Sequence, residues 1–183
     1  MKRTCVLVLA VVGCGVAAAQ QTPPVPWQPV KFLIGHWVGE GNSETKQAGA
    51  GSCSFEPDLQ NKVLIRRNHA EYPAADGHPA IAHDDLMVIY PDAALHQLRA
   101  FYTDNEGHVI HYTVTAGSDG LTALFLGDTE PGHARYRLTY ALTQSAHMTI
   151  TLEMAASDKP DQFRKIIDGK MRRSDVGSAS LLP

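Results

Sequence analysis

The stretch that decides the fold is Phe32-Leu33-Ile34-Gly35-His36-Trp37-Val38-Gly39-Glu40-Gly41. An apolar run leads into Gly35 and Trp37, and Gly39 and Gly41 then alternate with other residues. Glycine inside a strand pattern marks a bulge, a tight bend or a place where another group lies close. The pattern therefore predicts a sharply coiled strand whose Trp37 side chain plugs a core.

Two segments toward the C-terminal end alternate most clearly between apolar and polar residues. Their apolar positions are Tyr136, Leu138, Tyr140 and Leu142, followed by Met148, Ile150, Leu152 and Met154. Period-two alternation puts successive side chains on opposite faces of a strand, so each segment has one core face and one wet face. The short link 144–146 makes the two segments an antiparallel pair.

The chain between these regions consists of short apolar runs separated by turn residues, which gives about nine or ten strands and an all-β domain. Among them, 86–90 is expected as a strand, and 72–79 as a loop dense in turn residues. A meander of this size must protect its edge strands, and closure into a single antiparallel up-and-down barrel removes them. A two-layer sandwich is the alternative.

Length and composition describe one ordinary globular domain. The chain has 183 residues, of which 44% are hydrophobic and 19% charged, and its formal net charge is −3. A mildly acidic chain with scattered basic residues is a poor partner for nucleic acid, which rewards clustered Lys and Arg.

The N-terminal segment is typical of an export signal. Lys2 and Arg3 precede an apolar run, and Ala17-Ala18-Ala19 forms a small-residue cleavage site. The run is too short to span a membrane, which takes roughly 20 residues. We expect a signal peptide over 1–19, a Pro-rich linker over 20–30, the barrel over 31–175 and a flexible tail over 176–183. Lipidation at Cys14 is the alternative, and either leads to an exported, periplasmic or secreted, protein.

One cysteine remains after cleavage behind Ala19. Cys53 then has no partner for an internal disulfide, and no base lies near it in the sequence. We expect Cys53 to be a small buried residue of a strand.

The motif Gly35-x-Trp37-x-Gly39-x-Gly41 resembles the entry of the lipocalin and calycin superfamily. It is most similar to nitrobindin-like barrels and to an uncharacterised family of secreted bacterial lipocalin-like proteins. The resemblance implies that the first-strand Trp closes the bottom of an up-and-down barrel and is covered by an Arg of the last strand. By parity with Ile167 and Met171, Arg173 is the candidate for that cover, with Arg172 second if a bulge intervenes. A solvated basic run at the end of the strand is the alternative.

Nitrobindin-like barrels bind haem through one histidine, and that residue cannot be aligned here. His108, His111 and His147 are the histidines in strand regions that could take the role, although His111 and His147 lie on polar positions. Haem binding therefore stays an alternative, and no cofactor is expected.

Three further groups of polar residues are candidates for metal binding or acid/base chemistry. His78, His83, Asp84 and Asp85 form the densest set of ligands suited to Zn or Mn, but polar residues commonly gather between a loop and a strand. We therefore expect no metal site. His69 and Glu71 share one strand parity and would serve as an acid/base pair if they lay inside the barrel. Asp104, Glu106 and His108 surround a hairpin tip, where we expect them to be solvated.

The sequence thus predicts an exported barrel that binds a small apolar or amphipathic ligand without catalysis, since a barrel of this strand count can hold one. The proposed pocket lining is Tyr136, Tyr140, Met148 and Met154, with plain core packing as the alternative role. A barrel enzyme using His69 and Glu71 is the second alternative. No catalytic residue is assigned, and the oligomeric state stays open.

Overall fold

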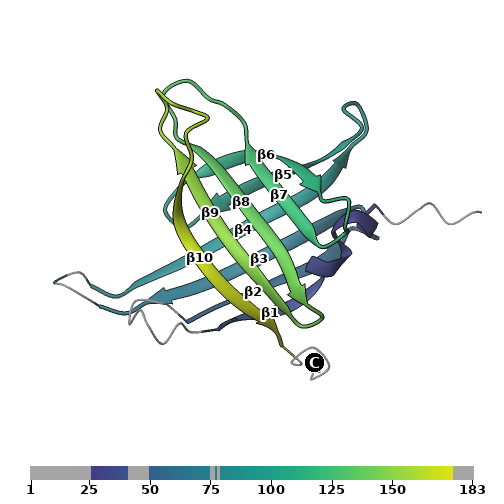
Figure 1. Cartoon of the computed structure of the whole chain (residues 1–183), viewed down its shortest axis with the longest axis horizontal. Coiled ribbons are helices and arrows are strands. Elements are labelled where there is room, and N and C mark those ends of the chain that lie inside the picture. Colours follow the sequence, from purple (N-terminus) through teal and green to yellow (C-terminus); the bar gives the residue numbers. More distant parts are fainter. Residues whose placement is uncertain (1–25, 41–49, 75–76, 78, 175–183) are drawn as a thin grey trace, which may run out of the picture.

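The computed structural model describes residues 26–40, 50–74, 77 and 79–174. They form one short 3-10 helix and ten strands (Figure 1). The elements are η1 (Gln28–Leu33), β1 (Gly35–Glu40), β2 (Ala50–Asp58), β3 (Val63–Tyr72), β4 (Ile81–Asp92), β5 (Gln97–Asp104), β6 (Val109–Ala116), β7 (Thr122–Gly127), β8 (Arg135–Gln144), β9 (His147–Ala155) and β10 (Arg164–Arg173).

The ten strands close into a single antiparallel barrel. Each strand pairs with its neighbour in the chain, and β1 pairs with β10 from Trp37↔Arg173 to Glu40↔Lys170. This closure confirms the predicted up-and-down barrel and excludes the two-layer sandwich. Only β9–β10 and β8–β9 show a register shift among the described pairs, at Lys165/Ile167 and Leu142/Gln144.

The helix η1 covers one end of the barrel, which we call the closed end. Figure 1 shows η1 (purple) against this end, with the β3–β4 hairpin extending to the opposite side. Trp27, Val30 and Leu33 are at most 1% exposed, so the helix is packed into the core. Val30 falls within the stretch 20–30, which the prolines predict to be an extended linker. Its buried side chain belongs to the barrel core instead.

Trp37 lies beneath the helix and is fully buried. Its indole Nε1 donates a 2.7 Å hydrogen bond to the carbonyl oxygen of Leu33, which satisfies the one polar atom of the ring. Trp37 therefore joins η1 to the barrel wall.

Arg173 completes the closed end from the last strand. Its guanidinium carbon lies 4.2 Å from the centroid of a Trp37 ring, and its nitrogens donate to the carbonyls of Ile34 (2.6 Å) and Phe32 (2.9 Å). Gly35 makes room for it, because a Cβ there would lie 2.5 Å from Arg173 Nη1. The φ of Gly35 is +123°, which L side chains rarely adopt.

Because the strands run up and down, the connections β3–β4, β5–β6, β7–β8 and β9–β10 all lie at the opposite end, which we call the far end. β4 differs most from its predicted bounds: it begins at Ile81 rather than Leu86, so the polar side chains of His83, Asp84 and Asp85 belong to the barrel wall. The wall near the far end therefore carries more polar side chains than the expected strand 86–90 would give it.

Candidate functional site

A buried ion pair lies on the inner wall of the barrel. Arg66 of β3 donates from Nη1 to Asp85 Oδ1 of β4, and their side chains are 5% and 3% exposed. Asn68 Nδ2 donates to the second carboxylate oxygen of Asp85 at 2.9 Å. Burying two charges is costly unless they are paired and hydrogen-bonded, and this arrangement meets both conditions.

His83 extends this polar cluster toward the far end. Its Nε2 lies 3.4 Å from Asp85 Oδ2 and 3.3 Å from the hydroxyl of Tyr102, and its Nδ1 lies 3.0 Å from Glu106 Oε1. The side chain of His83 is 21% exposed against 52% for Glu106. The imidazole thus connects a buried carboxylate to one that reaches solvent.

Asp104 forms the next link. Tyr102 donates to its Oδ2 at 3.0 Å, and His108 Nδ1 lies 2.8 Å from the same oxygen. The Asp104 side chain is 2% exposed, so the prediction that it would be solvated is wrong. The reason is local: Asp104 also accepts the backbone N–H groups of Glu106 and His108, which folds the hairpin turn over it.

The environment shifts the pKa values of these groups. Burial raises the pKa of Asp85, more than Arg66 lowers it. Burial and the nearby carboxylates of Asp85 and Asp104 raise the pKa of the Tyr102 hydroxyl, which keeps it a hydrogen-bond donor. Burial opposes the ionisation of Asp104, but hydrogen bonds from His108 lower its pKa overall. We call the set Arg66, Asn68, His83, Asp85, Tyr102, Asp104 and His108 the inner polar chain.

Two buried polar atoms beside this chain have no hydrogen-bond partner among the described residues. They are Arg66 Nε and the hydroxyl of Tyr140. Tyr140 is fully buried, and burial raises the pKa of its hydroxyl. An unsatisfied buried donor costs about 1–3 kcal/mol, so both atoms lower the stability of the barrel core.

Aromatic rings cross the barrel interior below the polar chain. Tyr102, Tyr112, Phe125, Tyr140 and Phe55 follow one another edge to face, with centroid separations of 6.4, 6.2, 5.9 and 5.4 Å. Edge-to-face contacts are the favoured geometry of aromatic pairs. The ladder reaches from the polar chain into the packed half of the barrel.

A cleft of about 540 Å³ opens at the far end, next to His108. It lies between the start of β6 and the segment that joins β7 to β8, and Ile110 and Tyr136 reach it from the inner wall. His111, Glu130 and His133 surround its mouth. The cleft thus combines apolar inner side chains with polar ones at its rim.

The structure places the four proposed lining residues differently. Tyr136 lines the cleft, and Met154 is half-buried opposite it in the β8–β9 register. Tyr140 and Met148 are 0% and 1% exposed within the core cluster, away from the cleft. Among these four, Tyr136 is therefore the residue that an entering ligand would meet first.

Of the two remaining glycines of the Trp37 motif, Gly39 lies among the described residues. A Cβ at Gly39 would lie 3.3 Å from the carbonyl oxygen of Gly51, so β1 and β2 approach closely there. Gly41 lies outside the described residues, as do Cys14, the expected signal peptide and the expected C-terminal tail.

The three histidines considered for haem lie at separate places. His147 Nδ1 is 3.1 Å from Glu40 Oε1, and His111 packs its ring 5.5 Å from that of Phe101. His108 is bound to Asp104 as described above. Each imidazole thus already has a protein partner.

Within the set of residues considered as metal ligands, the side chains of His83, Asp84 and Asp85 point to different faces of β4. His83 and Asp85 face the inside, while Asp84 is exposed and bonds to His69 at 2.7 Å on the outside. His78 lies outside the described residues, and within the described ranges no three His, Cys, Asp or Glu side chains are grouped to hold a metal ion. Alternation of side chains along β4 is the cause.

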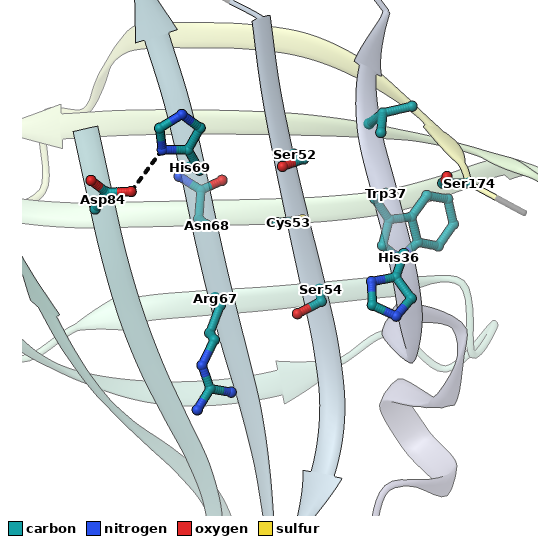
Figure 2. A pocket seen from close by; sticks show the side chains of 11 residues that line it. His36, Trp37, Ser52, Cys53, Ser54, Arg67, Asn68, His69, Asp84 and Ser174 are labelled. Atoms are coloured by element: carbon teal, nitrogen blue, oxygen red, sulfur yellow. Dashed lines mark hydrogen bonds and ion pairs between the residues drawn. The ribbon is translucent and has the colours of Figure 1, made fainter. Parts of the chain in front are cut away.

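The idea that His69 and Glu71 act inside the barrel is wrong. Both side chains lie on the outer wall, 47% and 70% exposed, because β3 turns Leu64 and Arg66 inward instead. His69 Nδ1 bonds to Asp84, and its Nε2 lies 3.3 Å from Glu71 (Figure 2 shows the bond to Asp84).

Comparison with models of protein families finds no match, and neither does comparison with curated proteins. The closed ten-stranded antiparallel barrel is consistent with a calycin or lipocalin-like fold. Within the described residues, no helix has the length and hydropathy needed to cross a membrane.

Sequence reasoning missed Arg66, Tyr102 and Asp104 as members of a site. The signal that could have found them is parity: each shares its strand face with a buried neighbour, Leu64 for Arg66 and Ala100 for the other two. A polar residue on the inward parity of a barrel strand indicates an internal polar network.

Proposed function

We propose that this protein is an exported carrier that binds one small amphipathic molecule in the far-end cleft, without converting it. The observation that supports this most is the cleft itself, about 540 Å³, since pockets for small ligands usually measure about 300–1,000 Å³. The closed end leaves no comparable entrance, because Trp27, Trp37 and Leu33 are packed there.

The two walls of the cleft suit the two parts of such a ligand. Ile110 and Tyr136 offer apolar surface on the inner side, and burying it contributes about 25 cal/mol per Å². His108 and Glu130 offer polar contacts at the rim. A ligand with an apolar body and a polar end would satisfy both.

The polar groups of the site support binding rather than acid/base chemistry. His83 and His108 each have a ring nitrogen within 3.0 Å of a carboxylate, so these imidazoles are held in place by the protein. General acid/base catalysis needs a group free to exchange a proton with the substrate. The inner polar chain is better suited to fixing the shape of the cleft.

The test uses the neutral amphipathic probe N-phenyl-1-naphthylamine with the full mature protein. Wild type should bind one equivalent saturably, with a rise in probe fluorescence. Ile110→Glu should weaken binding by at least about tenfold, because it places a charge against the apolar wall. The matched control is Leu95→Glu, at a position 57% exposed in the β4–β5 turn of the closed end.

Equal binding by both variants, or no saturable binding by wild type, would contradict the proposal. Native mass spectrometry of protein purified from its own producing cells then identifies what the cleft carries. The expected result is one retained molecule that is lost in Ile110→Glu and kept in Leu95→Glu.

A further inference from the structure

A second hollow lies on the outer wall, separate from the far-end cleft. It measures about 420 Å³ and spans β1 to β4 (Figure 2). Its outward-facing residues form two cross-strand rows that follow the strand register. One row is His36, Ser54 and Arg67, and the other is Val38, Ser52, His69 and Asp84.

The carboxylates next to this hollow contact histidines. Asp84 and Glu71 each bond to one nitrogen of His69, at 2.7 and 3.3 Å. These bonds raise the pKa of His69, which favours its positive charge. His36 Nε2 lies 3.8 Å from Glu56, at the long limit of an ion pair. Within the described residues, none of these carboxylates bonds to Arg67, Ser52 or Ser54.

Three hydrogen-bond donors of the hollow have no partner among the residues that the structure describes. They are the guanidinium of Arg67 and the hydroxyls of Ser52 and Ser54. Figure 2 shows that they come from the neighbouring strands β2 and β3, with His36 of β1 beside Ser54. Adjacent strands lie about 4.8 Å apart, so one tetrahedral anion can contact Ser54 and Arg67 together.

We propose that this outer hollow binds the phosphate or sulfate group of a small ester. Arg67 contacts two anion oxygens through its guanidinium, which matches the geometry of such groups. Ser52 and Ser54 donate to the third terminal oxygen and to the ester oxygen, and the imidazole of His36 adds a further donor. Val38 and the rest of the hollow receive the organic part of the ester.

The test is calorimetric titration of the full mature protein in low salt, in three arms: inorganic phosphate, phenyl phosphate and phenyl sulfate. Wild type should bind phenyl phosphate saturably, and about 0.5 M NaCl should weaken it because exposed charges are screened. Arg67→Gln should weaken it about three- to tenfold, discounting a charged hydrogen bond for solvent exposure. Ser54→Ala should weaken it about twofold.

The matched control is Arg164→Gln, an exposed arginine of β10 outside the hollow, which should leave binding unchanged. Tighter binding of phenyl phosphate than inorganic phosphate supports an ester as the ligand, and equal binding would reduce the site to one for the free anion, against the proposal. No saturable binding, or equal losses in Arg67→Gln and Arg164→Gln, overturns it. Binding of N-phenyl-1-naphthylamine in Arg67→Gln should stay unchanged, which separates this site from the far-end cleft.

Discussion

Breaking the buried Arg66–Asp85 pair is the most informative change inside the barrel. The two side chains are 5% and 3% exposed, so neither charge can reach water when its partner is removed. Arg66→Met leaves the Asp85 carboxylate uncompensated, and Asp85→Leu leaves the guanidinium. Each should lower the free energy of unfolding by about 3–5 kcal/mol, the usual cost of breaking such a pair.

The double variant should cost much less than the sum of its parts. Arg66→Met with Asp85→Leu removes both desolvated charges, and its main loss is the amide of Asn68 left without its acceptor, about 1–3 kcal/mol. The singles sum to about 6–10 kcal/mol, so the coupling energy should be at least about 3 kcal/mol.

Urea unfolding followed by circular dichroism measures these values, with the slope m checked for each variant. A single variant that fails to fold does not end the test, because the double variant should still fold. Additive losses, with a coupling below about 1 kcal/mol, would refute the reasoning, since they would mean that water screens the pair.

Three further predictions concern single side chains. Gly35→Ala should lower the free energy of unfolding by about 2–3 kcal/mol, from a strained φ and from the displacement of Arg173. Gly77 also has a positive φ, +81°, but a Cβ there would meet nothing within 4 Å, so Gly77→Ala should cost only the strain of φ, about 1 kcal/mol. Chemical denaturation distinguishes the two variants. Tyr140→Phe should be neutral or should stabilise the ligand-free protein by up to about 1 kcal/mol, because the hydroxyl that it removes has no hydrogen-bond partner among the described residues. A clear destabilisation would show that this hydroxyl does have a partner. Burial raises the pKa of Cys53 to about 11, so iodoacetamide at pH 8 should modify this thiol about 100-fold more slowly than in the unfolded chain. The rate should rise as the pH approaches the pKa. Equal rates in the folded and unfolded protein, measured by mass mapping, would contradict the burial of Cys53.

The barrel could be predicted because its signals are local. Alternation over the last strands follows from the pleat of a strand, which no distant contact needs to decide. Closure followed from the need to protect edge strands. The contact between Arg173 and Trp37 joins the two ends of the sheet, and the resemblance to lipocalin-like chains, not alternation, pointed to that pair.

The inner polar chain could not be read in the same way. Polar residues are normally assigned to the wet face, so the sequence predicts Asp85 between a loop and a strand and Asp104 at a hairpin tip, although both face the interior. In β3 the apolar residues Val63, Leu64 and Ile65 stand together, and parity alone could not decide which face is buried. The choice of Leu64 as the inward residue puts Arg66 inside, where only contacts with other strands can satisfy it.

The proposed carrier function requires that a ligand enters at the far end and lies against Ile110 and Tyr136. The decisive measurement is a crystal structure of the protein soaked with N-phenyl-1-naphthylamine. We predict electron density for the probe in the cleft beside His108, in contact with both inner side chains. Density for the probe at the η1 end, or on the outer wall with the cleft free of it, would contradict the account.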